Sequence, residues 1–196
     1  MKKYLFLLFA LVLLPLASLA QKQVDARYAA GAVPVVDGFV KFEQQVSAPG
    51  RSKADICEAL KQYVETHLVE GPEQLPVARI TEFDPAAGVL AASIGEYMYF
   101  KRTNWQTHRV RFYYQLVVEA TDGAARVSLR NLHYSYDPEV TDGDFADDRR
   151  AEDWITDEQA LTKNGKKLAR ISGKFRTHTI DRKDQLFSEI EKALAQ

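Results

Sequence analysis

Histidines are the side chains of this sequence that are best suited to acid–base or metal chemistry at neutral pH. The four are His67, His108, His133 and His178, and none stands at metal-ligand spacing from another histidine or from the single cysteine. The sequence also lacks the H-E-x-x-H, C-x-x-C and G-x-S-x-G motifs and a glycine-rich phosphate loop. We therefore expect surface or rim histidines, and we identify no catalytic residue, no cofactor and no metal ligand.

An acidic run at residues 137–148 has enough carboxylates to suggest a calcium loop. An EF-hand loop needs a glycine at its sixth position. Counted from Asp137, the sixth position is Asp142, and a register that places Gly143 there begins with Pro138. The EF-hand pattern therefore fails. We favour a solvated acidic loop, with a non-standard calcium loop as the alternative.

A basic stretch near the C-terminus has the opposite charge. It contains Lys163, Lys166, Lys167, Arg170, Lys174 and Arg176. We expect a solvated, irregular loop, or an internal partner for the acidic run. The alternative is a site for an anionic glycan, a lipid head group or a partner protein, and added salt would weaken such binding strongly.

Aromatic residues on two adjacent strands form the surface that we consider most suited to binding. In residues 110–118 apolar and polar side chains alternate, so Arg111 and Tyr113 share one face of that strand. If Met98 and Phe100 of the preceding strand are buried, Tyr97 and Tyr99 lie on the same uncovered face as Arg111 and Tyr113. Trp105 and Arg111 are expected at its rim. Tyrosine and tryptophan offer large contact area and a polar group, so we predict a binding face for a peptide, glycan or partner protein. In the alternative, tyrosines merely suit exposed strands, or the N-terminal arm covers them.

The elements that position these residues follow from periodicity. We expect a strand at 40–46, a helix from Ser52 with Asp55 as its N-terminal cap pair, strands at 77–83, 89–100, 110–119 and 127–136, a short helix at 154–161 and a second amphipathic helix at 181–194. Strand, helix, four strands and helix (β-α-β-β-β-β-α) predict an α+β fold, in which two helices cover one face of a curved antiparallel sheet.

The last strand changes phase along its length. Val127 and Leu129 occupy odd positions, whereas Leu132, Tyr134 and Tyr136 occupy even ones. A strict period of two cannot place both sets on the same face of a sheet. We therefore predict a β-bulge near Arg130 and Asn131, which would curve the sheet.

The N-terminus has the form of a secretory signal peptide. Two lysines precede an apolar run at residues 5–16, too short to span a bilayer, and small residues follow at Ser18 and Ala20. We expect cleavage after Ala20, with an uncleaved membrane anchor as the alternative. Residues 21–36 then form a mobile or loosely packed arm, and residues 37–196 form a single domain.

The composition of the exported chain is that of a soluble protein without a strong charge. Loss of Lys2 and Lys3 from the 26 basic residues leaves 24 against 27 acidic ones. This balance gives no general attraction to nucleic acid or to an anionic membrane. Cys57 has no second cysteine to pair with, and we expect it to be a small buried hydrophobe.

Several short segments together resemble a known family. They are residues 36–38, 48–53, 111–116, 154–158, 172–176 and 179–181, which read VDG, APGRSK, RFYYQL, WITDE, SGKFR and TID. As a set they are similar to a domain-of-unknown-function family of exported bacterial proteins with a fold like that of the TATA-binding protein (TBP-like). The resemblance covers residues 33–194. It implies a fold and a compartment but no activity, and DNA binding by the TATA-binding protein is not carried over.

These features lead to two functional hypotheses for an exported periplasmic or extracellular protein. The first is a non-enzymatic binding or assembly module of the cell envelope, whose partner is an envelope protein, peptide or glycan and not a nucleic acid. The second is an envelope hydrolase with an unrecognised active site. A pocket that gathers titratable groups with shifted pKa values would favour the enzyme, and a broad aromatic face would favour the module. A subunit of a larger envelope assembly is a third reading.

Overall fold

A six-stranded antiparallel sheet forms the body of the molecule, with the strand order β3-β7-β6-β5-β4 and with β8 paired to β7. The computed structural model describes residues 24–103, 105, 107–136 and 148–195. The strands of the sheet are β3 Phe42–Ser47, β4 Arg79–Asp84, β5 Val89–Arg102, β6 Thr107–Thr121, β7 Ala124–Tyr136 and β8 Arg149–Arg150. A separate two-stranded ribbon consists of β1 Val35–Val36 and β2 Phe39–Val40.

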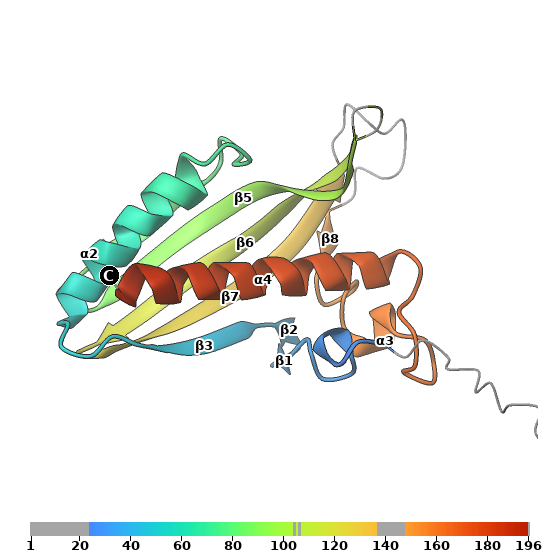
Figure 1. The fold of residues 1–196 in the computed structure, drawn as a ribbon, viewed down its shortest axis with the longest axis horizontal. Coiled ribbons are helices and arrows are strands. Elements are labelled where there is room, and N and C mark those ends of the chain that lie inside the picture. Colours follow the sequence, from blue (N-terminus) through green and yellow to red (C-terminus); the bar gives the residue numbers. More distant parts are fainter. Residues whose placement is uncertain (1–23, 104, 106, 137–147, 196) are drawn as a thin grey trace, which may run out of the picture.

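Two long helices lie on the same face of this sheet (Figure 1). α2 Lys53–Tyr63 continues into a π-helical segment, η2 Val64–Val69, and α4 Ser172–Ala195 crosses the sheet. The short elements are a 3-10 turn, η1 Ala26–Tyr28, and α3 Asp157–Ala160. At the start of α2, Ser52 and Asp55 form a capping box, in which each side chain accepts a hydrogen bond from the backbone of the other. The predicted cap pair is therefore confirmed.

The hydrophobic core lies between these helices and the sheet. The buried positions of β6 include Val110, Phe112, Tyr114, Leu116 and Val118. α2 contributes Ile56, Cys57 and Leu60, and α4 contributes Phe175, Ile180, Leu186, Phe187 and Ile190. Because strand side chains alternate between faces, the other set on β6 points away from the helices. The α+β fold predicted from the sequence, with two helices on one face of a curved antiparallel sheet, is confirmed.

A β-bulge in β7 resolves the phase change seen in the sequence. The pairing of β6 with β7 shifts between Tyr113, which is opposite His133, and Gln115, which is opposite Arg130. Asn131 sits at the shift with φ 54°, a left-handed conformation that asparagine tolerates better than most residues. Because of the extra residue, the side chains on both sides of the bulge reach the core: Val127, Leu129, Leu132 and Tyr134 are all buried. The predicted bulge is confirmed.

Several predicted boundaries need correction. The strand expected at 40–46 is two strands, because Val40 pairs with Val35 in the ribbon whereas Phe42 pairs with Leu129 in the main sheet. The helix expected at 154–161 is helical at Asp157–Ala160 alone. α4 begins at Ser172, within the stretch that we expected to be irregular and basic. Its first turns were missed because the buried positions there include Gly173, Arg176 and Thr179, which do not form an apolar stripe.

Residues 24–36 contact the rest of the domain at several points, although most of these residues are exposed, and the expectation of a mobile or loosely packed arm stays a prediction. Val33 is buried in the core. Tyr28 Oη donates a hydrogen bond to Asp181 Oδ1 at 2.7 Å. Arg27 forms ion pairs with Asp181 and Asp184 of α4, at 3.0 and 2.9 Å. The segment therefore belongs to the folded domain and lies along α4.

Two further expectations concern segments that the structure does not describe. The predicted signal peptide, residues 1–20, lies outside the described residues, and so does most of the acidic run, residues 137–147. Within the described part of the chain, no helix is both long enough and apolar enough to cross a bilayer.

Cys57 is described and buried, and burial raises the pKa of its thiol, as expected for a core residue.

Arg176 joins the arm, α3 and α4 at one buried point. The side chain has no exposed surface. Its guanidinium donates to the carbonyl oxygens of Tyr28, Ala29 and Ile155 at 2.6 to 2.9 Å, and Nη2 also donates to Asp157 Oδ1 at 2.7 Å. A buried charged side chain is tolerated when all of its hydrogen-bond donors have partners. Removal of that side chain leaves the partners buried without a hydrogen bond.

We predict that Arg176→Met lowers the free energy of unfolding by about 3 kcal/mol, because three carbonyl oxygens lose a charged donor. Urea denaturation measures the loss, and limited proteolysis should cut the 24–36 segment faster in the variant. Arg170→Met is the control: Arg170 is exposed, so its loss should change stability by less than about 0.5 kcal/mol. Equal stability of Arg176→Met and the native protein would contradict the assigned role.

Candidate functional site

The face of the sheet that points away from α2 and α4 carries a row of aromatic and arginine side chains. We call it the open sheet face and define it by Tyr97, Tyr99, Arg109, Arg111, Tyr113 and His133. Tyr97 is directly opposite Arg111 across β5 and β6, and Tyr99 is opposite Arg109. All three tyrosines are half-buried. Among the described residues, both long helices lie on the opposite face (Figure 1), so the sequence-predicted tyrosines and Arg111 do come together on an uncovered surface.

Cation–π and hydrogen-bond contacts hold the tyrosines of β5 in place. Arg109 Cζ lies 3.9 Å from the ring centroid of Tyr97, and Arg102 Cζ lies 4.7 Å from that of Tyr99. Tyr99 Oη donates to Glu73 Oε2 at 2.6 Å, and Arg102 also binds Glu73. Burial and this hydrogen bond raise the pKa of Tyr99, whereas the bonds from Tyr99 and Arg102 lower the pKa of Glu73. Such fixed rings need little further ordering to bind a partner.

A shallow hollow of about 430 Å³ lies beside Tyr113 on the same face. The Tyr113 ring stacks on His133, with centroids 4.8 Å apart and planes 13° apart. Gly95 allows Val77 and Tyr113 to pack closely over β5 beside the hollow, because a Cβ there would lie 2.8 Å from Val77 Cγ2 and 3.1 Å from the Tyr113 ring. Ser93 and Asn131 add polar groups to its wall. The hollow offers apolar contact area with a few hydrogen-bonding groups, as binding sites commonly do.

Trp105 stands apart from this cluster. It lies in the turn between β5 and β6, and its side chain is 97% exposed. Arg111 is not at the rim, as the sequence suggested, but in the middle of the face opposite Tyr97. The role of these residues in binding stays a prediction.

The four histidines are dispersed. His67 stacks on Tyr63, His133 stacks on Tyr113, and both His108 and His178 contact the ring of Phe100. Within the described ranges, no group of three or more histidine, cysteine or acidic side chains is arranged to hold a metal ion.

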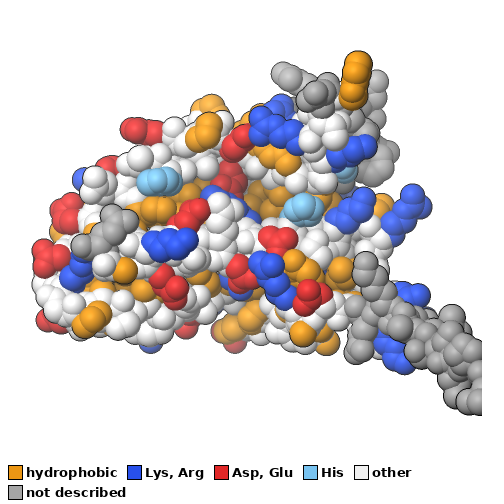
Figure 2. All heavy atoms as spheres, viewed as in Figure 1, with side chains coloured by type: hydrophobic (Ala, Val, Ile, Leu, Met, Phe, Trp, Pro, Cys, Tyr) orange, Lys and Arg blue, Asp and Glu red, His pale blue; other side chains and the backbone are white. Residues whose placement is uncertain are grey.

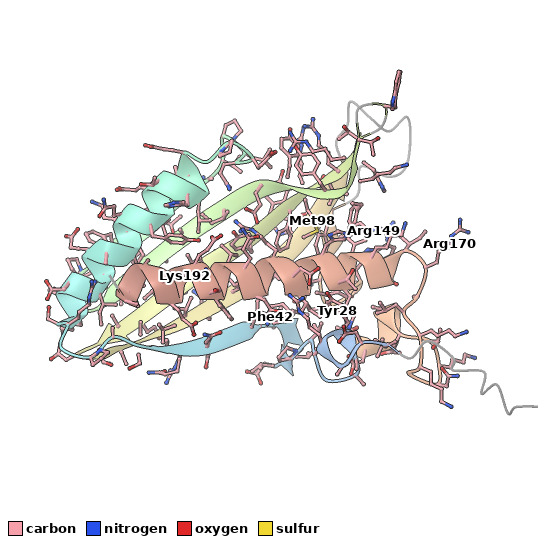
Figure 3. The ribbon with its side chains drawn as sticks, viewed as in Figure 1. Tyr28, Phe42, Met98, Arg149, Arg170 and Lys192 are labelled. Atoms are coloured by element: carbon pink, nitrogen blue, oxygen red, sulfur yellow. The ribbon has the colours of Figure 1, made fainter. Side chains whose placement is uncertain are left out.

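Sequence reasoning missed a cleft on the helix-covered side. We call it the polar cleft; it has a volume of about 450 Å³ and is lined by residues of η2, the following segment, β5 and α4, among them Tyr97 and Tyr99 of the open sheet face. Figure 2 shows acidic, basic and histidine side chains gathered on this side of the molecule. Figure 3 places Met98, one of the lining residues, on the side of α4 opposite to Tyr28 and Phe42.

A buried ion pair is part of this cleft. Arg182 of α4 donates from Nε and Nη2 to the two carboxylate oxygens of Glu96 on β5, each at 2.8 Å. Glu96 is 4% exposed. The sequence does carry a signal for it, because Glu96 occupies an inward position of β5, in phase with Ile94 and Met98. A carboxylate among apolar inward positions requires a buried partner.

A second carboxylate of the cleft is held by neutral donors. Glu189 accepts hydrogen bonds from Tyr63 Oη at 2.6 Å and from Gln185 Nε2 at 2.8 Å. Although partial burial opposes ionisation, these bonds keep the pKa of Glu189 below its usual value. Burial and the same bond raise the pKa of Tyr63. Glu189 is therefore an anion, and Tyr63 a neutral donor, over the physiological pH range.

We predict that Tyr63→Phe lowers the unfolding free energy by about 1 to 2 kcal/mol at pH 7, since it removes a hydrogen bond to a charged group. The lowered pKa of Glu189 means that its stabilisation is present above the pKa of the unfolded state and is lost as the pH falls through the folded value. The difference in unfolding free energy between the variant and the native protein should therefore become smaller below about pH 4. Urea denaturation at pH 7 and at acidic pH measures it.

The Glu189→Gln background is the control for this prediction. Because an amide does not ionise, Tyr63→Phe in that background should lower the unfolding free energy by the same amount at both pH values. A pH-independent difference in the native background as well would contradict the assigned linkage.

Comparison with known proteins places the chain in a family. The model of a domain of unknown function with TBP-like fold, DUF4468, matches residues 42–135. No curated protein matches the chain. The crystal structure of a TBP-like protein from Parabacteroides distasonis ATCC 8503 is similar in fold, with a TM-score of 0.65 at 17% identity over 84% of this chain and 97% of the other.

A more similar structure supplies the sequence relationship. The crystal structure of a DUF4468 family protein from Bacteroides ovatus ATCC 8483 shares 31% identity with this chain, with a TM-score of 0.78. The alignment covers 89% of this chain and 97% of that one. The chain therefore belongs to the DUF4468 family, whose fold is TBP-like.

Proposed function

We propose that this protein is a non-enzymatic binding or assembly module of the cell envelope, which holds its partner against the open sheet face. One observation carries the proposal: Tyr97, Tyr99 and Tyr113 lie together on the uncovered face of the sheet. Interfaces are enriched in tyrosine and arginine. Tyrosine buries a large area with only two side-chain torsions to order. The N-terminal sequence supports export, which would bring this face to envelope partners.

The charge of the open sheet face supports an acidic peptide, protein segment or glycan as the partner. Arg109 and Arg111 stand among the tyrosines, and Arg102 borders them. Glu73 is the neighbouring carboxylate, and it is engaged by Tyr99 and Arg102. Guanidinium groups recognise carboxylates, sulfates and phosphates through paired, planar donors. Attraction of this kind weakens with added salt.

The polar cleft is the observation that would favour an envelope hydrolase instead, because it gathers titratable groups with shifted pKa values. Its lining residues include no serine, threonine or cysteine nucleophile. The pKa values of Glu73 and Glu189 are lowered, so both stay ionised at neutral pH and are poor proton donors. We therefore favour binding over hydrolysis.

Affinity capture tests this proposal. The protein from residue 21 onward would be tagged and used to capture partners from envelope extract of its own source, with mass spectrometry for identification. We expect a partner that the native protein retains and that Tyr97→Ala/Tyr99→Ala/Tyr113→Ala releases, because the variant removes the aromatic contact area. Purified partner and protein should then bind at least tenfold more weakly with the variant.

The matched control replaces three exposed apolar side chains elsewhere, Val35→Ala/Val36→Ala/Phe39→Ala. These side chains are about half exposed on the β1–β2 ribbon, and their loss should leave the affinity unchanged. Both variants must show the native circular dichroism spectrum. A partner that survives the tyrosine variant and is lost by the ribbon variant would refute the open sheet face as the site.

A further inference from the structure

We propose that the polar cleft is a second binding site, which takes a small organic cation that carries primary ammonium groups. It lies between η2, the 71–74 segment, β5 and α4, and it extends to the part of β5 where Tyr97 and Tyr99 of the open sheet face also line it. Its volume of about 450 Å³ is within the range of small-molecule sites. The inference goes beyond the function proposed above. Tyr97 and Tyr99 line both surfaces, but the contacts assigned to this ligand are those of Glu189 and Gln74.

The charge of the lining residues favours a cation. Four carboxylates, those of Glu73, Glu96, Asp181 and Glu189, line the cleft, together with the single guanidinium of Arg182. Ion pairs with residues outside the cleft neutralise part of this negative charge. Arg102 pairs with Glu73, and Arg27 pairs with Asp181.

Glu189 forms no such ion pair within the described chain, although electrostatic interactions with Arg182 and His67 also lower its pKa. Both hydrogen bonds that it accepts within the described chain come from neutral donors, Tyr63 and Gln185. Its pKa lies below the usual value, so it is negatively charged at neutral pH. Two donors leave spare acceptor capacity on a carboxylate, which has about four lone-pair positions. An ammonium group beside Glu189 would neutralise its charge and fill this capacity.

Gln74 supplies a buried acceptor that needs a donor. Its Nε2 donates to Glu96 Oε2 at 3.2 Å and to the carbonyl of His67 at 3.4 Å, and these two acceptors fix which end of the amide is the oxygen. The Oε1 atom is then buried and, within the described chain, has no hydrogen-bond partner. A buried acceptor without a donor costs about 1 to 3 kcal/mol. A small shift of the Gln74 amide would expose this acceptor to a ligand that brings N–H groups, which would satisfy it, whereas a carboxylate ligand would not.

The Glu96–Arg182 pair gives this site a rigid, preorganised base. Its two parallel hydrogen bonds tie β5 to α4. The side chains are 6% and 20% exposed, so both were largely taken out of water on folding, at a considerable desolvation cost. Because Arg182 already satisfies Glu96, the pair holds Gln74 in position through Glu96 Oε2 and leaves Glu189 and Gln74 Oε1 to contact the ligand.

A series of five-carbon probes of equal length tests the charge and the donors separately. Cadaverine carries two ammonium groups, 1,5-pentanediol is neutral and glutarate is a dianion. Binding would be measured by calorimetry and by NMR amide shifts on the described protein. We expect cadaverine to bind and to shift the amides of residues 74, 96–98 and 181–189, while glutarate does not bind. Equal affinity for pentanediol, shifts outside the cleft, or no binding of cadaverine at millimolar concentration would each overturn the proposal.

Two variants examine the assigned contacts. Glu189→Gln keeps a hydrogen-bonding side chain of the same shape but removes the charge, and we expect it to weaken cadaverine binding by at least tenfold. Gln74→Leu removes the buried acceptor and should weaken it by a similar factor. Glu58→Gln removes an exposed carboxylate of α2 and is the charge-matched control, with unchanged affinity expected. Thermal unfolding identifies any variant that fails to fold, and equal weakening by Glu58→Gln would show mere non-specific attraction and refute the site.

Discussion

The alternation of apolar and polar side chains along β6 is the constraint on which the rest of this structure depends. Val110, Phe112, Tyr114, Leu116 and Val118 are all buried on one face. Because the side chains on one face of the strand are all buried in the core, the side chains on the other face can take another role. The helices pack on the first face, and the tyrosines and arginines of β5 and β6 share the second.

The bulge in β7 extends this constraint to the end of the sheet. Without the additional residue at Asn131, either Val127 and Leu129 or Leu132 and Tyr134 would point away from the helices. The same irregularity brings Asn131 and His133 beside Tyr113 and forms one wall of the hollow on the open sheet face. The feature that completes the core therefore also shapes the candidate binding surface.

α4 connects the remaining parts of the molecule through one buried arginine, Arg176, and one that is largely buried, Arg182. Arg176 holds the arm and the residues around α3 by their carbonyl groups. Two turns further along, Arg182 pairs with Glu96 of β5. A buried charge costs free energy and requires fixed partners, so it specifies one arrangement of these elements. In this way the helix fixes both the packing of the N-terminal segment and the base of the polar cleft.

Part of this structure could be predicted from the periodicity of the sequence and from short local motifs. The fold class, the capping box of α2, the bulge and the tyrosines of the open sheet face all follow from alternation or from short local patterns. The start of α4 could not be found in this way, since a glycine, a threonine and an arginine take core positions there. The packing of residues 24–36 depends on Arg27 and Arg176, whose partners are distant in sequence. The polar cleft was missed for the same reason, because Glu96 and Arg182 meet through tertiary contact alone.

If the partner lies against the open sheet face, site-specific photo-crosslinking in the living source organism should capture it there. A photoreactive phenylalanine analogue would replace Gln115, which borders the hollow beside Tyr113, or Glu58, which is exposed on α2. The account predicts a crosslinked partner from position 115 and none from position 58. A partner crosslinked from position 58, with none from position 115, would contradict it.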